Sequence, residues 1–572
     1  MDVVLVGLPG SGKSAVGRRL AHRHGATFVD LDDAIEKAAG RPIPEIFAAD
    51  GEAAFRALER QAVTDLGPAD PGPGLRTVVA TGGGAVVDPR NRWALYRGRL
   101  PIWLDVRPEV LAQRLRRSPN VRPLIVGRDP MGAIRELGRD RDRFYSAAER
   151  MNGVAELASL VERIDELVAR RAGARPAVSA VDAARPSPPG AAGPAETEPV
   201  STVLLRGRSL GGDLVIGEGI AAAVVADALR GLRARRAILV SEPGAWAAVG
   251  EALGSALAAD GWPVERIFLP GGEGAKRMAV IENAASQLAA LRAERGEPLV
   301  AIGGGALGDA AGFLAASWLR GVPWIQVPTT LVAQIDSSIG GKTGVDLPDG
   351  KNLVGAFHPP AAIVTDIAFL RSLPERQRRA ALGEAVKMAA LGDEALFGLL
   401  ERDGEAIARG DEAAFSSGAV AELVERAAWA KVAVVDADEK EGAADGRITL
   451  NLGHSLGHAV EAVGGFGDLL HGEAVGHGLR AAVRIGRELG VTPPDRGERI
   501  ERLLTWLGLA TERLPYPLEI VLGVLATDKK HQAGNLRWVL PTADGSVIRA
   551  DVPADVVERA AASLLVADGV PT

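Results

Sequence analysis

The stretch DVVLVGLPGSGKSAVGRRLAHRHG, residues 2–25, decides the fold of the first part of the chain. A short apolar run is followed by a glycine-rich loop, residues 7–14, and then by a segment with helical spacing. This order matches the P-loop pattern G-x-x-x-x-G-K-[ST] in its expected context between a strand and a helix. Because backbone N–H groups of such a loop surround phosphate, the stretch predicts a nucleotide site on a parallel α/β sheet. The alternative is a glycine turn that carries Lys-Ser by chance.

Each residue of the loop has an expected role with ATP. Gly10, Ser11 and Gly12 are expected to line the phosphates, Lys13 to neutralise the transferred phosphoryl group, and the Ser14 hydroxyl to ligate Mg²⁺. A P-loop indicates the nucleotide and leaves the acceptor open.

Composition limits what the whole chain can be. Its 572 residues are 47% hydrophobic and 24% charged, and they include no cysteine. This length predicts roughly two to four domains, and no apolar run approaches the roughly eighteen residues that cross a membrane. The acidic start MDVVLVG does not resemble a secretory signal, so we expect a cytoplasmic protein. Without thiolates, any bound metal must use imidazole and carboxylate ligands. A net charge of -7 and 4% aromatic residues argue against a nucleic-acid partner.

The sequence predicts a boundary at a segment that has few large apolar residues to form a core. Residues 172–200 are rich in Ala, Pro and Gly, which predicts a flexible linker. On both sides, short apolar runs alternate with helical stretches, the α/β pattern, and after Leu373 strand signals become sparse. The predicted boundaries are a P-loop domain at 1–170, a linker at 171–201, an α/β domain at 202–372, and a mainly helical domain at 373–565.

Acidic and basic side chains suggest an acceptor site beside the P-loop. Asp30 and Asp32 are two apart on an expected second strand, so both should point to one side, one near Mg²⁺ and one near a substrate hydroxyl. An acidic strand end that caps a helix is the alternative. The glycines at 82–84 would allow a ligand close to the backbone. Three arginines could bind a carboxylate or phosphate, or could be surface charges: Arg56, Arg122 and Arg141.

Together these segments resemble shikimate kinase up to about residue 165. GLPGSGKS, FVDLD, GEAAFR, TGGGAV, NVRPLI and RDRFY occur in that family's order. The resemblance implies transfer of phosphate from ATP to shikimate. It also implies that Asp32, Arg56, Gly83 and Arg141 hold shikimate, that Asp30 lies near the metal, and that Arg122 on a mobile lid contacts ATP. Arg143, where the family usually has proline, departs from the pattern.

A second glycine pattern lies in the C-terminal part. Gly303, Gly305 and Gly308 form G-x-G-x-x-G between an expected strand and an expected helix, which suits a dinucleotide pyrophosphate. The usual acidic residue about 20 positions later is missing, so a plain turn is the alternative. Lys342 and Lys351 then occur on expected glycine-bordered loops, which suggests an anionic substrate, although solvated lysines are equally ordinary there.

Histidines gather in NLGHSLGHAVEAVGGFGDLLHGEAVGH, residues 451–477, which holds four of the eight in the chain. His454 and His458 would share one helix face, and His471 follows a glycine-containing break. A carboxylate from an earlier helix, Glu384, could join two of these imidazoles on one Zn²⁺ and leave a position open for substrate. Packing and capping histidines are the alternative, and we expect His477 to be structural.

Residues 203–561 resemble 3-dehydroquinate synthase. LPGGEGAK, GGGALGD, RGVPWIQVPTTLVAQIDSSIGGKTG, GKNLVGAFHPP, GEAVK, RITLNLGHSLGHAVE, LLHGEAVGHG and TDKK occur in family order. The resemblance implies Zn²⁺ (or Co²⁺) on Glu384, His454 and His471, with His458 and Asn451 near substrate. The implied NAD contacts are Glu273, Lys276, Gly305, Asp309, Thr329, Thr330 and Lys342. The implied substrate pocket adds Asp336, Lys351, Asn352, Lys387, Lys431, Arg447 and Lys529. Arg320 resembles the arginine that reaches a neighbouring subunit, which implies a homodimer.

The two resemblances imply one bifunctional enzyme of the shikimate pathway. The fold expected is α/β throughout: a P-loop kinase domain with a parallel sheet, a linker, an NAD-binding α/β domain and a mainly helical metal-binding domain. The second reaction would oxidise a secondary alcohol of a phosphorylated seven-carbon keto acid with NAD, eliminate phosphate, return the hydride, and close a carbocycle after ring opening. The alternatives are another sugar-phosphate cyclase or a polyol dehydrogenase, fused to another small-molecule kinase or to a nucleotide-binding regulatory domain.

Overall fold

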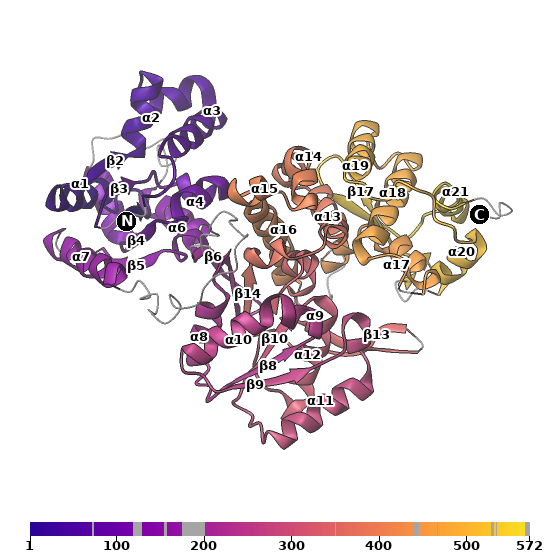
Figure 1. Ribbon diagram of the computed structural model, residues 1–572. Helices are drawn as coiled ribbons and strands as arrows, with labels where there is room; N and C mark the ends of the chain where they lie inside the picture. The colour runs from indigo at the N-terminus through magenta and orange to yellow at the C-terminus, as the bar shows by residue number, and fades with distance from the viewer. Residues whose placement is uncertain are drawn as a thin grey trace, which may run out of the picture. The chain divides into compact units, whose positions relative to one another are not determined.

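The computed structural model of the chain (Figure 1) contains two compact units. Contacts divide it into Met1–Gly207 with Gly217–Gly219, and Arg208–Ile216 with Ile220–Thr572. Arg122, Lys529 and nearly all of the predicted linker lie outside the described residues, and the domain boundaries stay a prediction. The structure describes residues 1–70, 74–117, 129–153, 157–173, 201–348, 350–438, 446–465, 467–527, 531–532 and 535–566.

A parallel sheet forms the centre of the first unit, with strand order β2-β3-β1-β4-β5. The central strand, DVVLV, is buried at every position, as expected for a parallel strand covered on both faces. The strands are β1 Asp2–Val6, β2 Thr27–Asp30, β3 Thr77–Ala80, β4 Leu100–Asp105 and β5 Glu149–Asn152.

Helices connect these strands and complete the core. The first helix begins at Lys13, directly after Gly12, whose φ of 94° favours glycine. Its buried residues Val16 and Leu20 join the core formed by β1 and the last helix of the unit. The helices are α1 Lys13–His24, α2 Leu31–Ala39, α3 Ile43–Asp65, α4 Pro89–Tyr96, α5 Pro108–Arg117, α6 Pro130–Tyr145 and α7 Leu157–Gly173.

The prediction that Asp30 and Asp32 share a strand is wrong. Strand β2 ends at Asp30, and Asp32 lies in the first turn of α2. The Asp30 carboxylate accepts a hydrogen bond of 3.2 Å from the backbone N–H of Asp32, so Asp30 caps the helix. The strand therefore ends at Asp30, and the chain continues as a helix that Asp30 caps.

A seven-stranded sheet with order β6-β7-β14-β11-β10-β8-β9 forms the centre of the α/β part at residues 202–366, drawn largely in magenta in Figure 1. The predicted strand before G-x-G-x-x-G is β10, and the helix after it begins at Gly305. The strands are β6 Thr202–Ser209, β7 Gly212–Glu218, β8 Ala237–Ser241, β9 Val264–Phe268, β10 Leu299–Gly303, β11 Trp324–Pro328 and β14 Ala362–Asp366. The helices are α8 Ala221–Gly231, α9 Pro243–Ala245, α10 Glu251–Ala259, α11 Met278–Ala290 and α12 Gly305–Ser317.

The segment that carries the predicted substrate lysines forms a two-stranded antiparallel ribbon, β12 Lys342–Leu347 and β13 Gly350–Phe357. Lys342 and Lys351 therefore lie on strands, and the expectation of loops is wrong. Glycines bring the two strands together, since a Cβ at Gly355 would lie 2.2 Å from the Thr343 carbonyl oxygen. The glycines of this segment led to the expectation of loops, but this close pairing of two strands requires them.

The rest of the second unit is mainly helical (orange to yellow in Figure 1), so the predicted fold class is confirmed. Among the described residues, no helix has the length and apolar character needed to cross a membrane. The helices are α13 Glu375–Ala390, α14 Glu394–Arg409, α15 Glu412–Ser416, α16 Ala419–Ala437, α17 His454–Val463, α18 His471–Glu488, α19 Pro494–Trp506, α20 Leu518–Ala526 and α21 Ala554–Ala562. Short strand pairs are β15 His531–Gln532 with β16 Asn535–Leu536, and β17 Trp538–Pro541 with β18 Ser546–Arg549.

Candidate active sites

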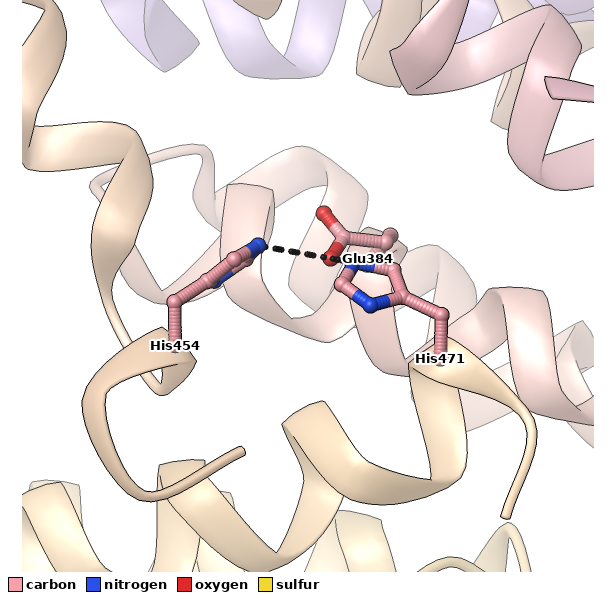
Figure 2. A group of neighbouring side chains, drawn as sticks. All are labelled: Glu384, His454 and His471. Carbon is pink, nitrogen blue, oxygen red and sulfur yellow. Dashed lines mark ion pairs between the residues drawn. The ribbon is translucent and has the colours of Figure 1, made fainter. Parts of the chain in front are cut away.

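Glu384, His454 and His471 converge on one point in the helical part of the second unit. Figure 2 shows their side chains directed toward each other from three segments of the chain. Glu384 Oε1 lies 3.5 Å from His454 Nε2 and 3.3 Å from His471 Nε2. Glu384 has no exposed surface and His454 is buried. One carboxylate and two imidazoles can thus face a single cation.

Helix starts and glycines bring these three residues together. His454 and His471 are the first residues of α17 and α18, and Glu384 lies within α13. A Cβ on Gly472 would lie 1.8 Å from the Ala380 carbonyl oxygen, and one on Gly383 would lie 2.2 Å from the Gly472 carbonyl oxygen. Because both glycines adjoin a member of the triad, the close crossing of α13 and α18 sets the spacing of Glu384 and His471.

Two buried lysines and an aspartate surround Glu384. Lys387 forms ion pairs with Glu384 and, at 3.5 Å, with Asp336, while Lys431 lies 2.8 Å from Asp336. Burial alone would raise the pKa of Glu384, but Lys387 and His471 outweigh it and hold that pKa well below its usual range. Burial lowers the pKa of Lys431, whereas Asp336 and Glu384 more than offset burial and raise the pKa of Lys387. The predicted catalytic residues Asp336 and Lys387 therefore adjoin the triad, as does Lys431.

A second carboxylate reaches the same histidines. His458 lies with its ring centroid 5.2 Å from that of His454 and 6.1 Å from that of His471. Glu461, to which the sequence assigned no role, places Oε2 3.3 Å from His471 Nδ1. Burial alone would lower the pKa of His471, but Glu384 and Glu461 raise it to about 10 in the protein without metal. His477 is buried elsewhere on α18, and burial lowers its pKa to about 4.

Predicted nucleotide-binding residues lie at the carboxyl edge of the seven-stranded sheet. Thr329 and Thr330 directly follow β11, and the Thr329 N–H donates to the Gly303 carbonyl at the end of β10. A Cβ at Gly305 would lie 2.7 Å from Ser337 Oγ, so glycine lets the first residue of α12 lie close to Ser337, and no side chain caps the start of this helix. This edge is where open α/β sheets bind nucleotides.

Lys276 is the centre of a buried polar group beside that edge. It lies 2.9 Å from Asp309 Oδ2 and 3.7 Å from Asp346 Oδ1, and it hydrogen-bonds to the side chain of Asn352. Asp346 also accepts from the Asn352 N–H at 2.8 Å, which holds Asn352 at a φ of 55°. Asp346 is a further residue that carried no sequence signal. Lys276 is thereby engaged within the protein, and its NAD contact stays a prediction.

The remaining predicted substrate residues lie around this region. Lys351 pairs with Glu273 at 3.2 Å, and the buried Arg447 donates to the Gly340 carbonyl at 3.1 Å. Asn451 ends a short 3-10 helix, Arg447–Asn451, three residues before His454. Lys342 is exposed at the start of β12, and Arg320 is exposed at a φ of 65° in the 3-10 helix Trp318–Arg320. Their roles stay predictions, as do those of the other predicted site residues.

In the first unit, the P-loop has the geometry that the sequence predicts. Lys13 is largely buried and donates to the carbonyl oxygens of Gly7, at 2.9 Å, and Leu8, at 3.2 Å. Ser14 is exposed on the first turn of α1, where its hydroxyl is free to reach a cation from solvent. The lysine is thus folded over an open helix N-terminus, which suits a phosphate.

The loop at residues 82–84 gathers the predicted acceptor residues. A Cβ at Gly82 would lie 2.7 Å from Asp32 Oδ1, one at Gly83 would lie 3.3 Å from Arg141 Nη1, and one at Gly84 would lie 2.8 Å from Arg56 Nη1. Arg141 also donates to the Gly83 carbonyl at 2.8 Å. One carboxylate and two guanidinium groups therefore lie against one glycine loop.

Glu59 also lies against Gly82 and was not singled out in the sequence. It is almost fully buried and pairs with Arg56 at 2.8 Å. Burial raises the pKa of Glu59, although Arg56 opposes that change. Its spacing of i, i+3 from Arg56 on α3 is the signal that could have revealed it. Arg143, the departure from the family pattern, lies with its guanidinium 4.6 Å from the Phe144 ring centroid.

The residues present fit the implied groups. Ligand atoms of Glu384, His454 and His471 all lie within 4.8 Å of one another, and three ligands of these types leave a fourth position open on a tetrahedral ion. The open start of α12 fits a dinucleotide pyrophosphate, and the start of α1 with Lys13 and Ser14 fits Mg²⁺-ATP.

Comparison with known proteins places the second unit. Residues 266–380 match the family model for the 3-dehydroquinate synthase N-terminal part, and residues 381–531 match that for its C-terminal part. A curated 3-dehydroquinate synthase from Synechococcus sp. is 43% identical over 319 residues, covering 56% of this chain and 85% of that protein. The chain belongs to the 3-dehydroquinate synthase family. The synthase part also resembles 2-epi-5-epi-valiolone synthase from Streptomyces hygroscopicus, whose structure has NAD⁺ and Zn²⁺ bound. That similarity is 28% identity with a TM-score of 0.57, covering 62% of this chain and 97% of the other.

The first unit carries a different domain. Residues 9–170 match the shikimate kinase family model. The shikimate kinase of Acinetobacter baumannii, in complex with shikimate, is 34% identical over 30% of this chain and 93% of that chain, with a TM-score of 0.28. The chain thus joins a shikimate kinase domain to a 3-dehydroquinate synthase, as the sequence predicted. The family matches and curated relatives support a bifunctional shikimate-pathway enzyme.

Proposed function

We propose that the synthase unit converts 3-deoxy-arabino-heptulosonate 7-phosphate to 3-dehydroquinate with loss of phosphate, and that the kinase unit phosphorylates shikimate to shikimate 3-phosphate with ATP. The observation that supports the first reaction is the convergence of Glu384, His454 and His471 beside Lys387 and Asp336. The observation that supports the second is the approach of Asp32, Arg56 and Arg141, which are predicted shikimate ligands, to the loop Gly82–Gly84.

In the synthase, Glu384, His454 and His471 would hold Zn²⁺ or Co²⁺. When bound, the metal polarises a substrate hydroxyl and the NAD at the edge of β10 and β11 supplies reversible hydride transfer. Asp336 holds the ammonium groups of Lys387 and Lys431 in a water-poor site, where they can bind substrate anions. His458, next to the triad and exposed, would exchange a proton between substrate and solvent.

Anion binding by this unit would use residues around the ribbon β12–β13. Lys351, Asn352, Arg447 and Asn451 supply donors for the substrate carboxylate and phosphate. Arg320, on an exposed turn, would serve the neighbouring subunit of a homodimer. The families are biosynthetic, and we propose that the enzyme acts in the cytoplasm on small molecules.

In the kinase, Lys13 would bind the transferred phosphoryl group and Ser14 would bind Mg²⁺ at the start of α1. Asp32 would accept the proton of the attacking shikimate hydroxyl, and Arg56 and Arg141 would fix the shikimate carboxylate. Asp30 caps α2, so its influence on the metal would be electrostatic through space.

Product analysis tests the synthase proposal against related cyclases. We expect equimolar 3-dehydroquinate and inorganic phosphate from 3-deoxy-arabino-heptulosonate 7-phosphate, with no net NADH, because the hydride returns in each turnover. Net NADH would indicate a polyol dehydrogenase. A carbocyclic product other than 3-dehydroquinate would indicate another sugar-phosphate cyclase.

A shikimate-dependent ADP-release assay tests the kinase proposal. Lys13→Ala should abolish ADP release while leaving 3-dehydroquinate formation unchanged, because Lys13 lies in the other unit. ADP release that survives Lys13→Ala would contradict the assignment, and ATP binding without any turnover in the parent protein would indicate a regulatory nucleotide domain.

A further inference from the structure

Glu461 lies at the metal triad although neither motif nor spacing assigned it a role. It is a buried residue of α17, seven positions after His454 and three after His458, so the three side chains share one helix face. A buried carboxylate on that face requires a partner, because burying an unpaired charge is costly. Its partners connect it to the proposed chemistry.

The imidazole of His471 lies between two carboxylates. Its Nε2 is 3.3 Å from Glu384 Oε1, and its Nδ1 is 3.3 Å from Glu461 Oε2. The two contacts use opposite nitrogens of one ring. A neutral imidazole that offers Nε2 to a cation must carry its proton on Nδ1, and a carboxylate at Nδ1 both fixes that tautomer and holds the ring orientation.

We propose that Glu461 is a positioning residue that accepts a hydrogen bond from Nδ1–H of His471 and so presents Nε2 to the metal. This inference rests on the proposed metal site at Glu384, His454 and His471, and it adds a residue that acts through His471 without touching the ion.

Direct ligation is the competing arrangement. Ligand atoms of His458, Glu461 and His471 also lie within 4.8 Å of one another. In that group His458 is exposed, whereas the other group contains the fully buried Glu384 and the buried His454. A cation gains most where water is excluded and ligands are held rigidly, so the geometry favours Glu384, His454 and His471 as ligands and leaves Glu461 to orient.

The second oxygen of Glu461 extends the contact toward the substrate residues. Its Oε1 lies 3.9 Å from Lys351 Nζ, which also pairs with Glu273 at 3.2 Å. Glu461 thus connects a metal ligand to a lysine on β13. Because Lys351 is partly exposed, solvent screens this contact, and the hydrogen bond to His471 is the stronger of the two interactions.

Zinc affinity, measured by competition with a chromophoric chelator on the full chain, tests the proposal. Glu461→Met keeps the volume and removes the acceptor, and it should weaken zinc binding about 10- to 100-fold. Glu461→Gln keeps an acceptor oxygen and should stay within about threefold of the parent. His458→Ala, one turn earlier on the same helix face, is the matched control and should also stay within about threefold. Shikimate kinase activity of each preparation checks that the chain is intact.

The outcomes are distinct. Unchanged affinity in Glu461→Met overturns the proposal, and parallel losses in Glu461→Gln and His458→Ala overturn it in favour of direct ligation. If Glu461→Met does not fold, ¹⁵N-histidine spectra of the zinc-loaded parent decide: a protonated Nδ1 on His471 supports the proposal, and a protonated Nε2 overturns it. A parent protein that binds no zinc overturns the proposed metal site itself, and with it this inference.

Discussion

Asp32 and Asp33 are adjacent on α2 but have different surroundings. Asp32 lies against Gly82, whereas Asp33 is mostly exposed and pairs with Arg18 at 3.0 Å on the surface. We expect Asp32→Asn to lower kcat of shikimate phosphorylation by about 100-fold or more, because a general base contributes at least that much. Steady-state ADP release is the measurement.

Asp33→Asn is the matched control for this prediction. It removes the same charge one residue away, and an exposed ion pair contributes little, so kcat should change by less than about twofold. Equal losses of kcat in both variants would show that removing any negative charge from this turn of α2 lowers kcat and that Asp32 has no specific role.

At the scale of single residues, the sequence predicted the groups whose chemistry depends on spacing. Because the chain has no cysteine, a bound metal must use imidazole and carboxylate ligands, and two histidines four apart on one helix indicated such a site. In the structure His454 does contact Glu384. The sequence did not predict roles for Glu461, Glu59 and Asp346, because the role of a carboxylate depends on the residue with which it pairs. For Asp346 that partner, Lys276, comes from a distant part of the chain, and for Glu461 it is His471 on the next helix.

At the scale of helices, two glycines determine how α13 and α18 cross. Gly472→Ala would place a Cβ 1.8 Å from the Ala380 carbonyl oxygen, a backbone atom that cannot move away alone. We expect a loss of about 1–3 kcal/mol of unfolding free energy from overpacking, together with weaker zinc binding, because Glu384 and His471 adjoin the contact. Denaturant unfolding and chelator competition measure the two effects.

Gly476→Ala in the same helix is the control for the crossing. Its Cβ would lie 3.4 Å from Leu509 Cβ, an ordinary contact, and alanine has a better helix propensity by up to about 1 kcal/mol. That variant should be as stable as the parent or more stable. If Gly472→Ala behaves like Gly476→Ala, the close crossing does not set the metal geometry.

Elements with a strong period were predictable, and glycine-rich ones were not. The strand β10 and the helix α17 lie where the sequence placed them. The segment of the ribbon β12–β13 was expected to form loops, because glycine has a low strand propensity. In the structure the segment forms paired strands, because its glycines let the two backbones lie in close contact. Strand β2 ends at Asp30, whose side chain makes a single capping hydrogen bond. The periodicity of apolar residues does not predict such a bond.

At the scale of the whole molecule, the two activities depend on residues in different compact units. Lys13 and Asp32 belong to the first unit, and the metal triad belongs to the second. Removal of zinc with a chelator, followed by assay in Mg²⁺, should therefore abolish 3-dehydroquinate formation and leave shikimate phosphorylation intact. Added Zn²⁺ should restore the first activity. Parallel loss of both activities would contradict this independence.

The zinc content of purified protein, measured by elemental analysis beside its His454→Ala variant, tests the proposed metal centre most directly. We predict one zinc ion per chain in the parent, since Glu384, His454 and His471 form one site, and none retained by the variant. A parent that takes up no zinc, or a variant that retains it in full, would contradict the proposal that these three residues hold the catalytic metal.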